Sequence, residues 1–114
     1  MELKMERYTL KFNYVYTYFS DGEEMDGAVK EEIFSVTRGS RIKLYQMEDA
    51  TFHIKETGRD NIGRYVVLTL HDKESVALHE GVVEELSFEE KYHSMGEVCH
   101  NLYEGSVELI IEET

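Results

Sequence analysis

A stretch of alternating residues near the amino terminus, residues 7–19, constrains the fold of this chain more than any other feature. Bulky apolar and aromatic residues occupy every second position there: Tyr8, Leu10, Phe12, Tyr14, Tyr16 and Tyr18. Because successive side chains of a β-strand point to opposite faces, the pattern predicts a strand with an aromatic stripe on one face. Such a strand would be about 40 Å long at ~3.3 Å per residue, so we expect a bend or a bulge near Asn13.

Shorter alternating segments separated by turn-forming residues continue along the chain. They predict further strands over residues 31–37, 41–47, 51–56, 64–71, 75–79 and 106–113. The intervening segment 20–27 is expected to form a hairpin or a longer loop. Segment 81–105 is ambiguous, because Leu86, Phe88 and Tyr92 fit a period of two. Ser87 followed by Glu90, however, fits a capping box for a short helix over residues 88–95.

Short strands at this spacing are typical of all-β proteins, and no segment is long enough for a helical crossover between parallel strands. We therefore expect an all-β fold with at most one short helix. The architecture would be an antiparallel β-sandwich or a small β-barrel of about 7–9 strands. The length of 114 residues suits a single β domain spanning residues 1–114.

The net charge and the cysteine content of the chain indicate which kinds of partner it binds and in which compartment it is found. The formal net charge is −12, and residues 80–114 contain ten Glu residues with Lys91 as their one basic residue. Phosphate binding requires a positive field, so we expect no nucleic-acid partner. The chain has no apolar run of membrane-spanning length and no secretory signal at its start, so we expect no membrane association. A single cysteine, Cys99, favours a reducing, intracellular setting, and we predict a cytoplasmic location.

The sequence contains no recognisable catalytic signature. Weak candidates for metal ligation are His93, Cys99 and His100, whose spacing matches no standard zinc pair. A second candidate set lies in three predicted strands: His53, His71 and His79. The acidic turn segment 21–27 lacks the ligand spacing of a calcium loop, and there is no phosphate-binding glycine loop. We therefore expect no cofactor and no metal, and we lean against an enzyme.

The favoured hypothesis is a non-enzymatic, acidic binding module, such as an inhibitor, an immunity-type protein or an accessory protein. It would engage a basic protein partner in a salt-sensitive manner. Tyrosine is common at interfaces because it buries a large area at small entropic cost. The predicted binding residues are Tyr14, Tyr16, Tyr18, Tyr65, His71, Glu84, Glu85, Glu89 and Glu90.

Several alternatives stay open at this point. The plainer interpretation is that the aromatic stripe is core with a tyrosine rim, and that the acidic third is a solvated surface. A second functional hypothesis is a small-molecule-binding β-barrel whose cavity is lined by the predicted tyrosines and His71, which requires a closed barrel. A metal-dependent enzyme is the third hypothesis. The chain also lacks proline, so unguarded strand edges make a homodimer plausible.

Overall fold

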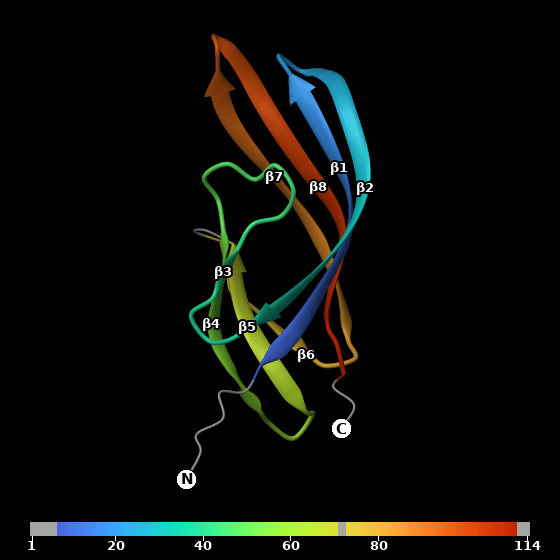
Figure 1. Cartoon of the computed structure of the whole chain (residues 1–114), viewed down its shortest axis with the longest axis vertical. Coiled ribbons are helices and arrows are strands. Elements are labelled where there is room, and N and C mark those ends of the chain that lie inside the picture. The colour runs from blue at the N-terminus through green and yellow to red at the C-terminus, as the bar shows by residue number, and fades with distance from the viewer. Residues whose placement is uncertain (1–6, 71–72, 112–114) are drawn as a thin grey trace.

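A computed structural model describes residues 7–70 and 73–111, and these residues form strands, turns and loops with no helix. The alternating segments of the sequence account for most of the strands (Figure 1). In chain order they are β1 (Tyr8–Ser20), β2 (Glu23–Val36), β3 (Arg41–Ile42), β4 (Phe52–Arg59), β5 (Arg64–Leu70), β6 (Val76–His79), β7 (Val83–Ser94) and β8 (Glu97–Leu109).

The strands form two antiparallel sheets that pack face to face as a β-sandwich. One sheet has the order β2-β1-β8-β7 and is called sheet A here; the other, sheet B, has the order β3-β4-β5-β6. The predicted all-β class is confirmed, and the sheets do not close into a barrel. Each strand pairs with its neighbour in the chain except at two seams, between β2 and β3 and between β6 and β7. β8 returns to pair with β1, so both seams separate edge strands of the two sheets.

The aromatic stripe of β1 forms the centre of the core, which is the plainer of the interpretations that its alternation left open. Its first five members, from Tyr8 to Tyr16, are at most 5% exposed. Ring contacts run from sheet A to sheet B and back: Phe12 lies 5.4 Å from Phe52, and Phe52 lies 5.5 Å from Phe88. Phe88 in turn stacks on Tyr103 at 4.6 Å. Aromatic pairs of this kind each add about 0.5–1.5 kcal/mol beyond the burial of their area.

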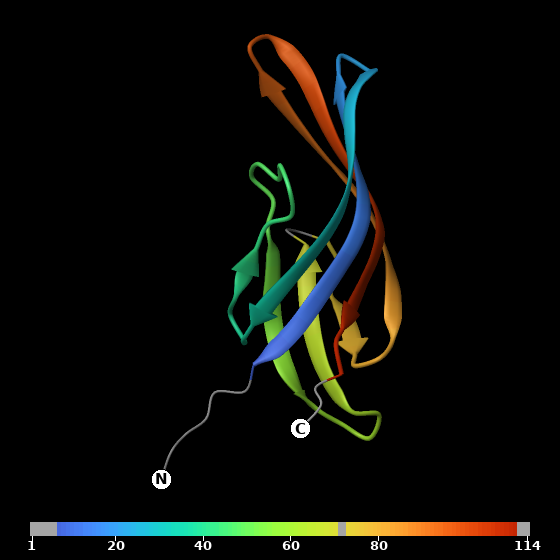
Figure 2. The ribbon, with the colours of Figure 1, turned by 45° about the vertical axis from the view of Figure 1, so that its right-hand side comes forward.

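Sheet A is much longer than sheet B. Its four strands have 12 to 14 residues, whereas the longest strand of sheet B has 8. The β1–β2 and β7–β8 hairpins therefore extend past the end of sheet B, as Figures 1 and 2 show. The inner face of sheet A at this end is covered by the β3–β4 connection, residues 43–51, instead of by a strand. Because sheet A is longer than sheet B, one end of its inner face is covered by a loop and the remainder by the strands of sheet B.

Segment 20–27 forms the expected hairpin, in which Asp21 and Gly22 alone make the turn and most of the segment is strand. Three other local predictions were wrong in their details. The bulge of the first strand lies between Tyr18 and Phe19 and not near Asn13. The helix over 88–95 does not form, since that segment pairs with β8 along its whole length. The strand over 41–47 ends at Ile42.

The carboxyl-terminal strand also differs from its prediction. It begins at Glu97, well before residue 106, and ends at Leu109. Ile111 lies within the predicted strand over residues 106–113, and the alternation of that segment predicts that it points inward, but it is 59% exposed. Its backbone lies beyond the last pairing with β1, which joins Leu10 and Leu109. The alternating pattern of the sequence extends to residue 113, but β8 ends at Leu109, where its pairing with β1 ends.

Candidate functional site

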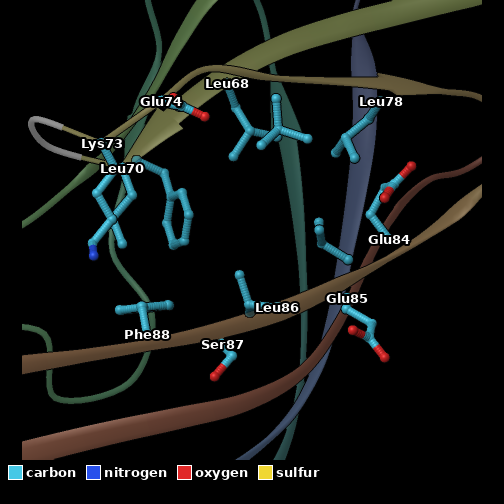
Figure 3. Close-up of a pocket in the computed structure, with 13 residues that line it drawn as sticks. Leu68, Leu70, Lys73, Glu74, Leu78, Glu84, Glu85, Leu86, Ser87 and Phe88 are labelled. Atoms are coloured by element: carbon cyan, nitrogen blue, oxygen red, sulfur yellow. The ribbon is translucent and has the colours of Figure 1, made fainter.

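The clearest concave feature lies at the seam between β6 and β7. The two edge strands are not hydrogen-bonded to each other there, and they leave a cleft of about 150 Å³ between the sheets. Figure 3 shows side chains from β5, β6 and β7 lining this cleft, with Lys73 at one end and Glu84 and Glu85 at the other. The apolar lining comes from the inward positions of these strands and their neighbours: Phe52, Leu68, Leu70, Val76, Leu78, Leu86, Phe88 and Val107. We call this feature the seam cleft.

The rim of the seam cleft is strongly acidic. A groove of about 360 Å³ adjoins it and shares Leu70, Lys73 and Phe88 with it. The acidic residues lining the two hollows are Asp49, Glu74, Glu84, Glu85, Glu89 and Glu90, and the basic residues are Lys73 and Lys91. Among the described residues, six carboxylates against two ammonium groups give this part of the surface a negative potential, which attracts cationic partners. All four glutamates predicted as binding residues therefore lie together along β7.

β7 is an edge strand of sheet A, so one side of its backbone lacks a strand partner within the described residues. The register with β8 divides its side chains between two faces. Glu84, Leu86 and Phe88 share the inner face with the core residues of β8, whereas Glu85 and Glu89 lie on the outer face. Unpaired backbone groups on an edge strand are a template for the addition of another strand. The seam cleft lies directly beside this edge.

Glu90 has a structural role in addition to its place at the rim. Its carboxylate accepts hydrogen bonds from three successive backbone N–H groups of the β3–β4 connection: Glu48 at 2.7 Å, Asp49 at 3.0 Å and Ala50 at 2.9 Å. Hydrogen bonds to a charged acceptor are among the stronger ones in proteins. Glu90 therefore fixes the connection against sheet A, whereas Glu89 is exposed and lies 3.8 Å from the ammonium of Lys91.

Two of the predicted tyrosines are buried and hold the same connection. The Tyr14 hydroxyl accepts a hydrogen bond from the backbone N–H of Tyr45 at 3.0 Å and donates one to Glu32 at 3.0 Å. The Tyr16 hydroxyl donates to the side-chain oxygen of Asn101 at 2.7 Å. Burial raises the pKa of both phenols, because the charged form is disfavoured away from water. Tyr14 is 2% and Tyr16 5% exposed, so neither ring can supply a large contact area to a protein partner.

Of the remaining predicted residues, Tyr18 lines a hollow together with Tyr16, whereas Tyr65 lies elsewhere. Tyr18 is half-buried, and its hydroxyl lies 3.3 Å from the Cys99 sulfur, a hydrogen bond that with burial raises the pKa of Tyr18 to about 12. Tyr65 lies on the outer face of sheet B, where it covers Gly58 and donates a hydrogen bond to Glu56 at 3.2 Å. That hydrogen bond raises the pKa of Tyr65. His71 lies outside the described residues.

The candidate metal ligands are also separated. Cys99 is 1% exposed on the inner face of sheet A, while His93 and His100 belong to its outer face by register. His79 is paired with Asp60 at 2.8 Å, which lowers the pKa of Asp60, and His53 lies two strands away in sheet B. Within residues 7–70 and 73–111, no group of three or more His, Cys, Asp or Glu side chains is arranged to hold a metal ion.

Sequence reasoning missed Asn101, which is completely buried. Its amide oxygen accepts the Tyr16 hydroxyl, and its amide nitrogen donates to the backbone carbonyl of Gln46 at 2.8 Å. The Tyr103 hydroxyl donates to the carbonyl of Tyr45 at 2.6 Å. The signal was present in the alternation of Cys99, Asn101 and Tyr103, where a polar residue occupies an inward position. Such a position requires a partner, because an unpaired buried amide is costly.

No protein-family model, curated protein or solved structure matches this chain. Among the described residues, no helix is long and apolar enough to cross a membrane. A functional assignment therefore depends on the geometry and chemistry of the surfaces described above.

Proposed function

We propose that this protein is a non-enzymatic binding module that holds an extended, basic segment of a partner protein along β7. The observation that supports this proposal is an apolar cleft directly beside an unpaired edge strand, with a rim of six carboxylates and two ammonium groups. Addition of a strand to a free sheet edge is a common mode of peptide recognition. Main-chain hydrogen bonds supply affinity in this mode, and alternate side chains supply specificity.

The two faces of β7 select different side chains of the added segment. Its inward side chains would enter the seam cleft and contact Leu78 and Leu86, so small or medium apolar residues suit these positions. Its outward side chains would lie beside Glu85 and Glu89, so lysine or arginine suits the alternate positions. Opposite charges across neighbouring strands contribute about 0.2–1 kcal/mol per pair. The preferred segment therefore alternates basic and apolar residues.

The same charges disfavour self-association through β7. Two copies paired along this edge would bring Glu85 and Glu89 near the glutamates of the second copy, and like charges in opposed positions destabilise a sheet. A homodimer, if formed, fits the outer face of β1 and β2 better, where Val15, Val29 and Ile33 are 49%, 84% and 61% exposed. Light scattering that gives the monomer mass at all accessible concentrations would refute this dimer.

Two further expectations concern the size of the ligand and the location of the protein. The seam cleft of about 150 Å³ and the adjoining groove of about 360 Å³ lie along an open strand edge and not inside a closed barrel, which favours an extended chain over a drug-sized ligand. A cytoplasmic location is supported by the single, buried Cys99. Recovery of the native protein from the secreted fraction of its cells would contradict that location.

A synthetic peptide of seven alternating lysine and valine residues tests the proposed function directly. Fluorescence anisotropy should give a dissociation constant in the micromolar range at 50 mM salt, weakened about fivefold or more at 300 mM by screening. The same peptide with glutamate in place of lysine should not bind. Salt-independent binding would contradict the electrostatic part of the proposal.

A matched pair of double variants separates local from global charge. Glu85→Gln with Glu89→Gln should weaken binding of the lysine peptide about 5–20-fold, because two cross-strand charge pairs are lost. Glu23→Gln with Glu24→Gln removes the same charge from exposed positions at the far end of β2 and should change binding less than about twofold. Equal losses in both variants would show that the peptide responds only to net charge.

A further inference from the structure

A second hollow lies on the inner face of sheet A, at the end that extends beyond sheet B. It has a volume of about 190 Å³ and is separate from the seam cleft. Side chains from β1, β2, β7 and the β3–β4 connection converge on it. Its described lining consists of four tyrosines, Tyr16, Tyr18, Tyr45 and Tyr92, together with Asp26 and Gln46. We call it the tyrosine cleft.

The rings of the tyrosine cleft are held in place by contacts within the protein. The Tyr45 ring packs edge-on against Tyr16 with a centroid separation of 5.2 Å. The Tyr16 hydroxyl is tethered to Asn101, and the Tyr18 hydroxyl lies within hydrogen-bonding distance of Cys99. The backbone of Tyr45 is itself fixed by the hydroxyls of Tyr14 and Tyr103. A ligand would therefore meet a preorganised aromatic surface and would lose less free energy to ordering of the site.

The electrostatic environment of the tyrosine cleft favours a cation. Among the described residues, the lining includes the carboxylate of Asp26 and no lysine or arginine. The Asp26 carboxylate accepts a hydrogen bond from the N–H of Gly27 at 2.8 Å, which fixes its orientation. The ammonium nitrogen of Lys30 lies 4.0 Å from the centroid of the Tyr45 ring, so this ring already holds a cation and a ligand would contact the other tyrosines. The carboxylates of Glu48 and Glu90 act on Tyr92 and oppose the positive charge of Lys30. Attraction between a cation and the faces of aromatic rings is strongest when the cation sheds its water easily.

We propose that the tyrosine cleft binds a methylated ammonium group, the head group shared by choline-like small molecules and by trimethylated lysine. Several tyrosines with one carboxylate form the type of surface that recognises quaternary ammonium ions. A volume of about 190 Å³ admits such a head group while remaining below the size of ordinary drug-sized sites. This inference is independent of the function proposed for β7, because the two sites share no lining residue.

Titration of the isotope-labelled protein with tetramethylammonium chloride tests the proposal. Ionic strength is held constant with sodium chloride, and the tyrosine ring signals are followed by nuclear magnetic resonance. We expect saturable shifts confined to the cleft, with a dissociation constant in the millimolar range. Absence of saturable shifts, or the same shifts with sodium alone, would overturn the proposal.

Substitutions at Tyr92 and Asp26 assign the shifts to the cleft. Tyr92→Leu removes an aromatic face and should weaken binding about tenfold, whereas Tyr92→Phe keeps the face and should stay within about threefold of the parent. Asp26→Asn should weaken binding about 3–10-fold. Asp26 is exposed, so this variant should fold even if Tyr92→Leu does not. Unchanged binding in both Asp26→Asn and Tyr92→Leu would refute the assignment.

Controls and a comparison of ligands complete the test. Glu104→Gln removes an exposed charge from the outer face of sheet A and should leave binding unchanged. Choline and a trimethyllysine peptide then distinguish the two sources of the head group. Binding of either one supports the cleft and identifies the source, while binding of guanidinium in preference to both would contradict it.

Discussion

Gly105 lies in the middle of β8, where it pairs with Tyr14 of β1 on one side and with Leu86 of β7 on the other. A Cβ atom at this position would lie 2.0 Å from the carbonyl oxygen of Asn13 and 2.5 Å from the Cα of Tyr14. Both are backbone atoms of the neighbouring strand, so rotation of a side chain cannot relieve the overlap. The close approach of β1 and β8 therefore requires glycine at this position.

Gly105→Ala should lower the free energy of unfolding by about 2–4 kcal/mol, because the two strands must move apart. Urea denaturation followed by circular dichroism measures the change. Gly27→Ala is the matched control on the other side of β1, where the added Cβ would lie 3.4 Å from the carbonyl oxygen of Tyr16. That variant should differ from the parent by less than about 1 kcal/mol. Similar losses in both variants would contradict a special role for Gly105.

Single residues were predictable from the sequence where one rule decides their position. The alternation of β1 correctly identified Tyr8 to Tyr16 as one face, because burial of aromatic rings dominates there. The sequence could not show that Tyr65 covers Gly58 on the opposite sheet face, since that contact depends on the register of β4 and β5. Residue type and alternation predicted which side chains are buried. Which side chains meet in one site depends on how the strands pair, and the sequence did not reveal that pairing.

The β3–β4 connection shows how an element can satisfy its hydrophobic pattern without forming a strand. In the predicted strand over residues 41–47, alternation places Ile42 and Leu44 on the inward face, and both residues do pack against the core. The backbone N–H and carbonyl of Tyr45, however, bond to the Tyr14 and Tyr103 side chains in place of a strand. Gln46 then takes a positive φ of 62°, which ends the extended conformation. Hydrogen-bond partners on distant strands, here the acceptor Tyr14 and the donor Tyr103, cannot be recognised from the local sequence pattern.

Glu90→Gln should loosen this connection. The substitution removes the negative charge that accepts three backbone N–H groups, so we expect a loss of about 1–3 kcal/mol in the free energy of unfolding. Hydrogen exchange at the amides of Glu48, Asp49 and Ala50 should become at least tenfold faster. The neighbouring substitution Glu89→Gln affects an exposed ion pair and should cost less than about 0.5 kcal/mol. Unchanged exchange at the three amides in Glu90→Gln would contradict the proposal that Glu90 fixes the β3–β4 connection.

The two hairpins of sheet A were unequally predictable for a physical reason. Asp21 and Gly22 form a turn with positive φ at both positions, and an Asp-Gly pair between alternating segments is a strong hairpin signal. The β7–β8 turn has the same geometry at Met95 and Gly96, but methionine seldom takes a positive φ. The sequence at Met95 and Gly96 is therefore a weak turn signal, and it did not outweigh the capping-box pattern of Ser87 and Glu90, which favours a helix. Pairing with β8, a tertiary interaction, decided the outcome.

For the molecule as a whole, the sequence predicted antiparallel strands around one core but left open whether they form a sandwich or a barrel. Antiparallel strands around one aromatic core follow from the alternation and the absence of crossover helices. The choice between sandwich and barrel depends on whether β2 meets β3 and whether β6 meets β7. Neither pairing is encoded in a local pattern, and the seam cleft exists because the second pairing is missing. The four glutamates of β7 could be predicted as acidic, but their position beside an open seam could not.

Alkaline pH should destabilise the whole fold through its buried phenols. Burial raises the pKa of Tyr14, Tyr16 and Tyr103 above the value of 10.0 for a free phenol. Below pH 10 these groups are protonated in both states and contribute no pH dependence. As the pH rises above 10, the unfolded chain releases protons that the folded chain retains, so the free energy of unfolding decreases. The expected slope is at most about 1.4 kcal/mol per pH unit for each buried tyrosine.

Denaturation at several pH values between 9 and 12 measures this slope, with absorbance at 295 nm reporting phenol ionisation. Tyr14→Phe should reduce the slope by about one proton. Ionisation of all eight tyrosines near pH 10 with the fold intact would contradict the proposed burial.

The most direct test of the proposed function is hydrogen exchange along β7 with and without the alternating lysine–valine peptide. Strand addition predicts that backbone amides of β7 on its free side become at least tenfold more protected. Signals of Leu78 and Leu86 in the seam cleft should shift at the same time. Protection at the edge of β2 with none at β7, or binding without any change in amide exchange, would contradict the account.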